Sequence, residues 1–183
     1  MAHVETRQSG EEIFQGKVFR VTVDQALLEN GKITRREVVH HNGGACVIAL
    51  NDQREIYMVK QFRYPFGEEL WELPAGKLEP NEDPFEAAKR ELEEEAGVTA
   101  QNYVELGVVY PTVGFCTEKI YIWAATGIVP SHQHLDEDEF LSVYKVPLEK
   151  AVEMVLSGEI RDSKTMVGIL KLNELIRQGK VRF

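Results

Sequence analysis

Several features that define other classes of protein are missing from this sequence. No apolar stretch approaches the roughly 20 residues of a membrane-spanning helix. Met1–Gly10 lacks the apolar run of a signal peptide, so we expect a cytoplasmic protein without a membrane partner. The 21 Lys and Arg residues are outnumbered by 30 Asp and Glu residues, which gives a formal net charge of -9. This charge argues against nucleic acid as a partner, because phosphate backbones attract basic surfaces.

Cysteine is scarce, which excludes a disulfide framework and a cysteine-rich metal site. Cys46 and Cys116 lie far apart and in no metal-ligand spacing, so we expect reduced, structural thiols. The GxxxxGK motif of phosphate-binding loops, the GxSxG motif of serine hydrolases and the HExxH motif of zinc proteases are also absent. What remains is a chain of 183 residues with ordinary globular composition, long enough for one domain with a core.

Alternating apolar and polar residues predict a chain rich in β-strands. An Asn30-Gly31 turn predicts that the first two strands form a hairpin, and a turn at Asn51-Asp52-Gln53 predicts a second hairpin. The expected strands cover residues 17–28, 33–40, 45–50, 56–61, 69–73, 103–110, 119–126 and 141–147, and two C-terminal helices cover residues 148–156 and 163–178. With a further helix in the middle of the chain, this order indicates a mixed sheet covered by helices.

The central helix is the best-defined element. Asp83 is a suitable N-cap, Pro84 fits the first helical position, and Glu86 is placed to complete a capping box. Gly97 is expected to end the helix. Three apolar residues recur at helical spacing and are expected to form the buried face: Phe85, Ala88 and Leu92.

The last turn of this helix carries four acidic residues, Glu91, Glu93, Glu94 and Glu95. Negative charge there opposes the helix dipole by ~0.3–1 kcal/mol per site, and Glu91 and Glu95 are also a repulsive i,i+4 pair. Such a conflict with local preference is typical of a functional site, although an acidic helix face is often only a solvated surface. Converging carboxylates suit a hard cation such as Mg²⁺, and bound cations would let an acidic protein bind phosphates.

The spacing of residues 76–98 is similar to that of a known motif. Gly76 is followed by Glu82 and then by the run Arg90-Glu91-Leu92-Glu93-Glu94-Glu95-Ala96-Gly97-Val98, which resembles the Nudix box at every fixed position. The resemblance implies an α/β protein, with an α/β/α sandwich around a mixed β-sheet and an N-terminal antiparallel β extension. It divides the chain into an N-terminal β-strand segment at residues 1–40 and a Nudix hydrolase domain at residues 41–183.

In the Nudix family, glutamates of the box hold a divalent metal ion. Carried over to this sequence, the implied metal-binding or catalytic residues are Glu91, Glu94 and Glu95, with Glu91 and Glu95 as the strongest pair. The backbone carbonyl of Ala75 is implied as a further ligand, and Gly76 as a turn that lets this carbonyl face the ion. The implied cofactor is Mg²⁺, with Mn²⁺ as an alternative.

Beyond the box, the sequence resembles the ADP-ribose pyrophosphatase and nucleoside diphosphate sugar hydrolase subfamily. The segments that carry this similarity include Phe14–Val18, Arg36–Val39, Val59–Pro65, Glu72–Gly76 and Leu135–Phe140. The resemblance implies that Arg36 and Arg63 contact the diphosphate or the terminal ribose, for which arginine is well suited. Arg90 matches the arginine that orients a metal-binding glutamate in the family.

The same resemblance implies a homodimer and a mobile acidic loop. N-terminal strands exchange between subunits in relatives, so residues 1–40 are expected to form the dimer and contribute to composite sites. One of Glu137 and Glu139 is expected to act as general base or extra metal ligand, and the sequence leaves open which.

One loop departs from the subfamily pattern. Gly114 and Glu118 are kept and are expected to bind substrate, but Val113 stands where proline is typical. This difference near the terminal sugar favours a broader specificity for nucleoside diphosphate sugars. Alternatives are hydrolysis of nucleoside triphosphates, NADH or dinucleoside polyphosphates, or a non-catalytic sensor of ADP-ribose.

Overall fold

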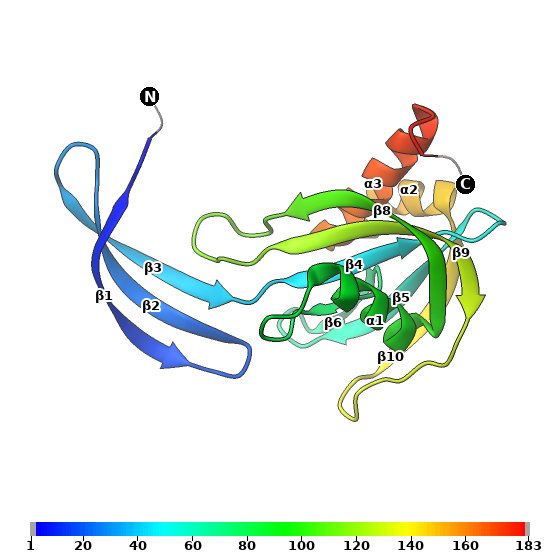
Figure 1. Cartoon of the computed structure of the whole chain (residues 1–183), viewed down its shortest axis with the longest axis horizontal. Coiled ribbons are helices and arrows are strands. Elements are labelled where there is room, and N and C mark those ends of the chain that lie inside the picture. The colour runs from blue at the N-terminus through cyan, green and yellow to red at the C-terminus, as the bar shows by residue number, and fades with distance from the viewer. Residues whose placement is uncertain (1–2, 182–183) are drawn as a thin grey trace. The chain divides into compact units, whose positions relative to one another are not determined.

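The computed structural model describes residues 3–181, which fold into two compact units (Figure 1). The main unit comprises Gly44–Val109 together with the chain from Ile120 onward. The N-terminal unit comprises the chain up to Gly43 together with the loop Tyr110–Lys119.

Two β-sheets form the centre of the main unit. The first is mixed and has the strand order β7-β4-β9-β8, in which only β4 and β9 are parallel. The second is antiparallel and has the order β10-β5-β6. The strands are β4 (Gly44–Ala49), β5 (Glu55–Arg63), β6 (Glu68–Glu72), β7 (Ala75–Lys77), β8 (Val98–Val109), β9 (Ile120–Pro130) and β10 (Leu141–Pro147).

The predicted hairpin of β4 with β5 is wrong. The two strands belong to different sheets and share only the isolated bridge between Leu50 and Ile56. All six residues of β4 are buried, and the strand pairs with β7 on one edge and β9 on the other, which leaves no edge for β5. The turn at Asn51 forms as expected, but the strands on either side of it diverge into separate sheets.

Helices cover both faces of these sheets, as Figure 1 shows. α1 (Pro84–Ala96) packs on one face, and α2 (Leu148–Ser157) and α3 (Ser163–Arg177) pack together on the other. The alternation of side chains along β4 produces two cores. Cys46 and Ile48 join the core with α2 and α3, whereas Ala45, Val47 and Ala49 join the core with α1. The predicted α/β/α sandwich is confirmed.

The ends of α1 follow the sequence signals in most respects. Asp83 accepts hydrogen bonds from the amides of Phe85 (2.9 Å) and Glu86 (3.2 Å), and Gly97 ends the helix with a φ of 64°. The expected reciprocal capping box does not form, because the Glu86 carboxylate pairs with Lys89 at 2.6 Å. Ala88 and Leu92 are fully buried as predicted, and Phe85 is partly buried.

The N-terminal unit is a three-stranded antiparallel sheet with the order β1-β2-β3. β2 (Phe19–Leu27) and β3 (Ile33–His41) form the predicted hairpin around Gly31, whose φ is 78°. β1 (Thr6–Gln15) was not predicted as a strand, because every residue in it is exposed and no alternation of apolar residues marks it. The loop Tyr110–Lys119 is attached to β3 by backbone hydrogen bonds at Val39.

Two further expectations can be compared with the structure. Within residues 3–181, no helix is long and apolar enough to cross a membrane. Cys46 is buried and both cysteines are free. Burial raises the pKa of the Cys46 thiol to about 12, which makes it an unreactive core side chain.

Candidate active site

Two glutamates at the end of α1 are buried against β7. Glu91 is 9% exposed and Glu95 is 2% exposed. The backbone amide of Ala75 donates a hydrogen bond of 2.8 Å to Glu95. Gly76 lies in β7 and is required for close approach rather than as the predicted turn, because a Cβ atom there would lie 1.9 Å from Oε1 of Glu91. β7 therefore binds Glu95 through the Ala75 amide and lets the Glu91 carboxylate approach because Gly76 has no side chain.

The buried position of these two acids raises their pKa values. Burial raises the pKa of Glu91 to about 7, against the opposing effect of Arg90, and the charges of Glu94 and Glu139 add to the rise. Burial also raises the pKa of Glu95 well above its ordinary value, and the charges of Glu91 and Glu139 act in the same direction. Two close carboxylates without a matching number of cations are a costly arrangement for a protein to maintain.

Arg90 is in direct contact with the acidic residues of the box. Its Nη1 atom lies 2.7 Å from Glu91 and 2.7 Å from Glu94, and its Nε atom lies 3.0 Å from Glu82. The hydrogen bonds from Arg90 lower the pKa of Glu82. The guanidinium thus connects three carboxylates of the box and fixes their relative orientation.

α1 has no basic residue in its last turn. The loop between β9 and β10 contacts this turn instead. The Gln133 side chain donates a 2.6 Å hydrogen bond to the Glu95 carbonyl, and the His134 amide donates a 2.9 Å bond to the Glu94 carbonyl. The Ser131 hydroxyl lies 2.5 Å from Glu93. These contacts satisfy carbonyls that the helix leaves unpaired and attach the base of the loop directly to the acidic turn.

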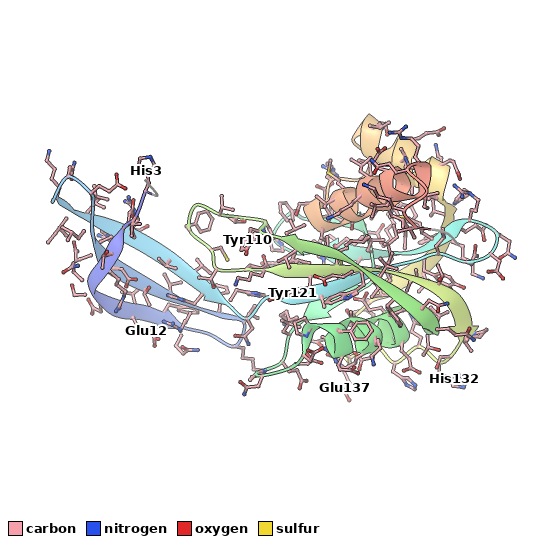
Figure 2. All side chains as sticks on the ribbon, turned by 45° about the horizontal axis from the view of Figure 1, so that its top comes forward. His3, Glu12, Tyr110, Tyr121, His132 and Glu137 are labelled. Atoms are coloured by element: carbon pink, nitrogen blue, oxygen red, sulfur yellow. The ribbon has the colours of Figure 1, made fainter. Side chains whose placement is uncertain are left out.

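The structure separates the two candidate acids in this loop. Glu139 is partly buried and accepts a 3.3 Å hydrogen bond from Nε2 of Gln61, and its charge acts on both Glu91 and Glu95. Glu137 is exposed and lies at the outer edge of the loop (Figure 2). Only Glu139 therefore faces the buried pair.

A second polar cluster lies at the end of β5; the sequence indicated its Arg63 as a substrate contact, but not Glu72 or Lys164. Arg63 donates to both oxygens of Glu72, at 2.5 Å from Nε and 2.8 Å from Nη2. Lys164 contacts Glu72 as well and lies 3.0 Å from Asp162. Burial acts to raise the pKa of Glu72, but the hydrogen bond from Arg63 and the charge of Lys164 outweigh it and keep that pKa low. Lys164, in the first turn of α3 after the N-cap Asp162, was the available sequence signal, because a cation is unfavourable there.

The residues around Glu91 and Glu95 fit a divalent cation. Their donor atoms are carboxylate oxygens, which hard cations prefer. Oε1 of Gln61 is buried without a hydrogen-bond partner among the described residues, so one more oxygen is available for a water or cation. Among residues 3–181, no group of three or more His, Cys, Asp or Glu side chains is arranged to hold a metal ion by itself. Mg²⁺ typically needs only one or two carboxylates together with water and substrate phosphates.

The remaining candidate residues belong to the N-terminal unit. Arg36 pairs with Glu5 through two hydrogen bonds of 2.9 and 2.7 Å. Glu118 lies 3.6 Å from Nδ1 of His41, and Gly114 is in open surroundings. The main unit alone therefore gathers the carboxylates, Ala75 and Arg63, but not these three residues.

Comparison with known proteins defines the class to which this fold and site belong. The NUDIX domain family matches residues 39–168, which include both buried glutamates. The chain belongs to the Nudix family. A solved structure described as an ADP compounds hydrolase has the same fold, with a TM-score of 0.83 and 21% sequence identity over 97% of each chain.

Two relatives are similar along nearly their whole length. The chain is 42% identical to the ADP-ribose pyrophosphatase of Bacillus subtilis, over 93% of this chain and 94% of the relative. It is 38% identical to the methanol dehydrogenase activator of Bacillus methanolicus, over 91% of this chain and 92% of the relative.

Proposed function

We propose that this protein is a Mg²⁺-dependent hydrolase that cleaves the pyrophosphate bond of ADP-ribose or another nucleoside diphosphate sugar. The observation that carries the proposal is the buried pair Glu91 and Glu95, held against β7 at the end of α1. The 42% identity with the ADP-ribose pyrophosphatase of Bacillus subtilis supports the substrate class. Mn²⁺ is the alternative metal. We also propose a cytoplasmic location without a membrane partner, and the net charge of -9 supports the expectation that nucleic acid is not a partner.

In this proposal each residue has a defined task. Glu91, Glu95 and the Ala75 carbonyl would hold the metal, while Arg90 orients Glu91 and Glu94. A divalent metal bound there would supply positive charge to the diphosphate and would lower the pKa of a water molecule. Glu139 accepts a proton from the water molecule that attacks one phosphorus. The bond from this phosphorus to the bridging oxygen then breaks, and a nucleoside monophosphate and a sugar phosphate are released.

The two acids of the loop give a matched test of the general base. Glu139→Gln is expected to lower kcat about 100- to 10,000-fold, because Gln cannot accept the proton. Glu137→Gln should stay within about threefold of the wild-type value, because Glu137 is exposed and away from the pair. Steady-state kinetics with saturating Mg²⁺ would measure both. Equal and mild losses in the two variants would place the base elsewhere.

We further propose that the N-terminal unit forms a homodimer. A three-stranded sheet is close to the minimum for independent stability, and β1 is exposed along its whole length. Large apolar side chains are exposed on this unit, including Ile13 (56%), Phe14 (50%) and Ile33 (62%). A second copy of the chain would cover such a surface, and its Arg36, Gly114 and Glu118 would supply substrate contacts that the main unit lacks.

Removal of residues 1–40 tests this assembly. The truncated chain should be monomeric by light scattering and should lose most of its activity, because both the interface and Arg36 are absent. Arg36→Ala in the full chain is the matched control: it should remain dimeric and show a raised KM. A fully active monomer after truncation would contradict the composite site.

A substrate panel tests the function as a whole. Purified protein with Mg²⁺ or Mn²⁺ would be incubated with ADP-ribose, other nucleoside diphosphate sugars, NADH, dinucleoside polyphosphates and nucleoside triphosphates, and the products separated by chromatography. Release of a nucleoside monophosphate and a sugar phosphate supports the proposal, and relative rates measure the effect of Val113. Cleavage of triphosphates or dinucleotides alone would reject the substrate class. Binding of ADP-ribose without turnover of any substrate would instead indicate a sensor.

A further inference from the structure

A buried group of charges connects α3 with β5, and Lys164 lies at its centre. Lys164 is 8% exposed, contacts the Glu72 carboxylate and lies 3.0 Å from Oδ2 of Asp162. Lysine is almost never buried to this degree unless it is paired. Its position in the first turn of α3 also opposes the helix dipole. A residue that breaks two local preferences at once is expected to serve a functional purpose.

The charges in this group can be assigned to pairs. Glu72 is 2% exposed and is shared by two cations, Arg63 and Lys164. Asp162 is the N-cap of α3 and accepts a 3.0 Å hydrogen bond from the Thr165 amide, so the helix N-terminus compensates for much of its charge. Lys164 can then balance Glu72, and the positive charge of Arg63 is left over.

Arg63 is the member of the group that reaches the solvent. Its side chain is 36% exposed, and it lies near enough to Glu95 for their charges to interact. Nε and Nη2 are used by Glu72, while Nη1 has no hydrogen-bond partner among residues 3–181. A carboxylate that was paired with Arg63 alone would cancel its charge and weaken its attraction for an anion.

We propose that Lys164 is a positioning residue that neutralises Glu72 and so leaves the charge of Arg63 available to an anionic substrate. The proposal rests on the proposed function in one respect, since it takes the anion to be the diphosphate of the nucleotide sugar. It also explains how a protein with a net charge of -9 presents a cation beside its acidic metal-binding surface.

Lys164→Met tests this role, because Met keeps much of the side-chain length and removes the charge. With ADP-ribose and saturating Mg²⁺, KM should rise about tenfold while kcat stays within about threefold. Lys171→Met is the matched control, since Lys171 is exposed on the same helix, and its kinetics should equal those of the wild type. An unchanged KM in Lys164→Met would overturn the proposal.

The double variant Glu72→Gln, Lys164→Met separates charge from packing. The neutral amide that replaces the Glu72 carboxylate no longer competes for the charge of Arg63, so KM should return to within about threefold of the wild-type value. A KM at or above that of Lys164→Met would indicate a packing defect and overturn the proposal. Should Lys164→Met fail to fold, the double variant still decides the question, because it leaves no buried charge without a partner.

Binding of inorganic pyrophosphate in the presence of Mg²⁺ distinguishes this inference from the proposed function. Calorimetry should show affinity about tenfold weaker for Lys164→Met than for the wild type, whether or not any nucleotide sugar is cleaved. If the wild type cleaves no substrate but this difference persists, the proposed function fails and the role of Lys164 stands. If the wild type cleaves ADP-ribose and both proteins bind pyrophosphate equally, the role of Lys164 fails and the function stands.

Discussion

Glu95→Gln is expected to lower kcat about 1,000-fold while the fold is retained. Gln keeps the shape of Glu95 and can still accept the hydrogen bond from the Ala75 amide, which is 2.8 Å long with Glu95 in place. It cannot supply the negative charge that binds a divalent cation, and hard cations bind neutral amide oxygens less strongly than carboxylates. Single-turnover kinetics over a range of Mg²⁺ concentrations would measure the loss. Near-normal turnover would exclude Glu95 as a metal ligand.

The stability of the same variant provides an independent check. Because Glu95 is buried and its pKa is raised, neutralising it should raise the melting temperature of the metal-free protein at pH 8. Glu86→Gln is the matched control, since Glu86 is exposed in the first turn of the same helix and pairs with Lys89. It should leave both kcat and the melting temperature close to the wild-type values. Gain of stability with loss of activity is the expected mark of a site that is maintained for function.

The sequence predicted the structure best where a local pattern of residues also determines which side chains are buried or which form the site. The spacing of Ala88 and Leu92 predicted the buried face of α1, and the acidic last turn predicted the site because it contradicts the helix dipole. Asp83 and Gly97 marked the helix ends correctly, because capping depends on groups within a few residues.

The features that were missed depend on contacts between distant parts of the chain. β1 has no apolar alternation, and it is held to β2 by backbone pairing and by the ion pair between Arg7 and Asp24. The partnership of Lys164 with Glu72 joins residues 92 positions apart, and no local pattern indicates which carboxylate a buried lysine will meet. The sequence predicts a turn at Gly76, but glycine is required there because the Glu91 carboxylate, from a different element, lies against it.

The metal-free protein is expected to lose stability as the pH rises from 5 to 8. Glu91 has an ordinary pKa of 4.5 and a pKa of about 7 in the folded chain, so the folded state binds more protons than the unfolded state between these values. Its stabilising contribution is therefore complete below about pH 4.5 and is lost as the pH passes through about 7. The loss amounts to about 3 kcal/mol, and the raised pKa of Glu95 adds to it in the same direction.

Other titrating groups can be separated from this effect. Glu72 and Glu82 have lowered pKa values, so they are ionised in both states above pH 5 and contribute little slope there. His40 has a lowered pKa, so its contribution to the stability of the folded protein increases as the pH rises. This opposes the effect of Glu91. Comparison of the wild type with Glu91→Gln removes this background, since His40 is the same in both. The difference between their melting temperatures should depend on pH through Glu91 itself and through Glu95, whose pKa the charge of Glu91 raises.

Addition of Mg²⁺ is expected to reverse the order of stability. Protons and cations compete for Glu91 and Glu95, so the metal should bind weakly at pH 5 and strongly at pH 8. A ligand that binds only the folded state stabilises it according to the ratio of its concentration to Kd, and 100-fold excess over Kd contributes about 2.7 kcal/mol. Melting curves in EDTA and in Mg²⁺ at both pH values would measure this. Equal melting temperatures under all four conditions would mean that the buried pair neither holds protons nor binds the metal, because either one makes stability depend on pH.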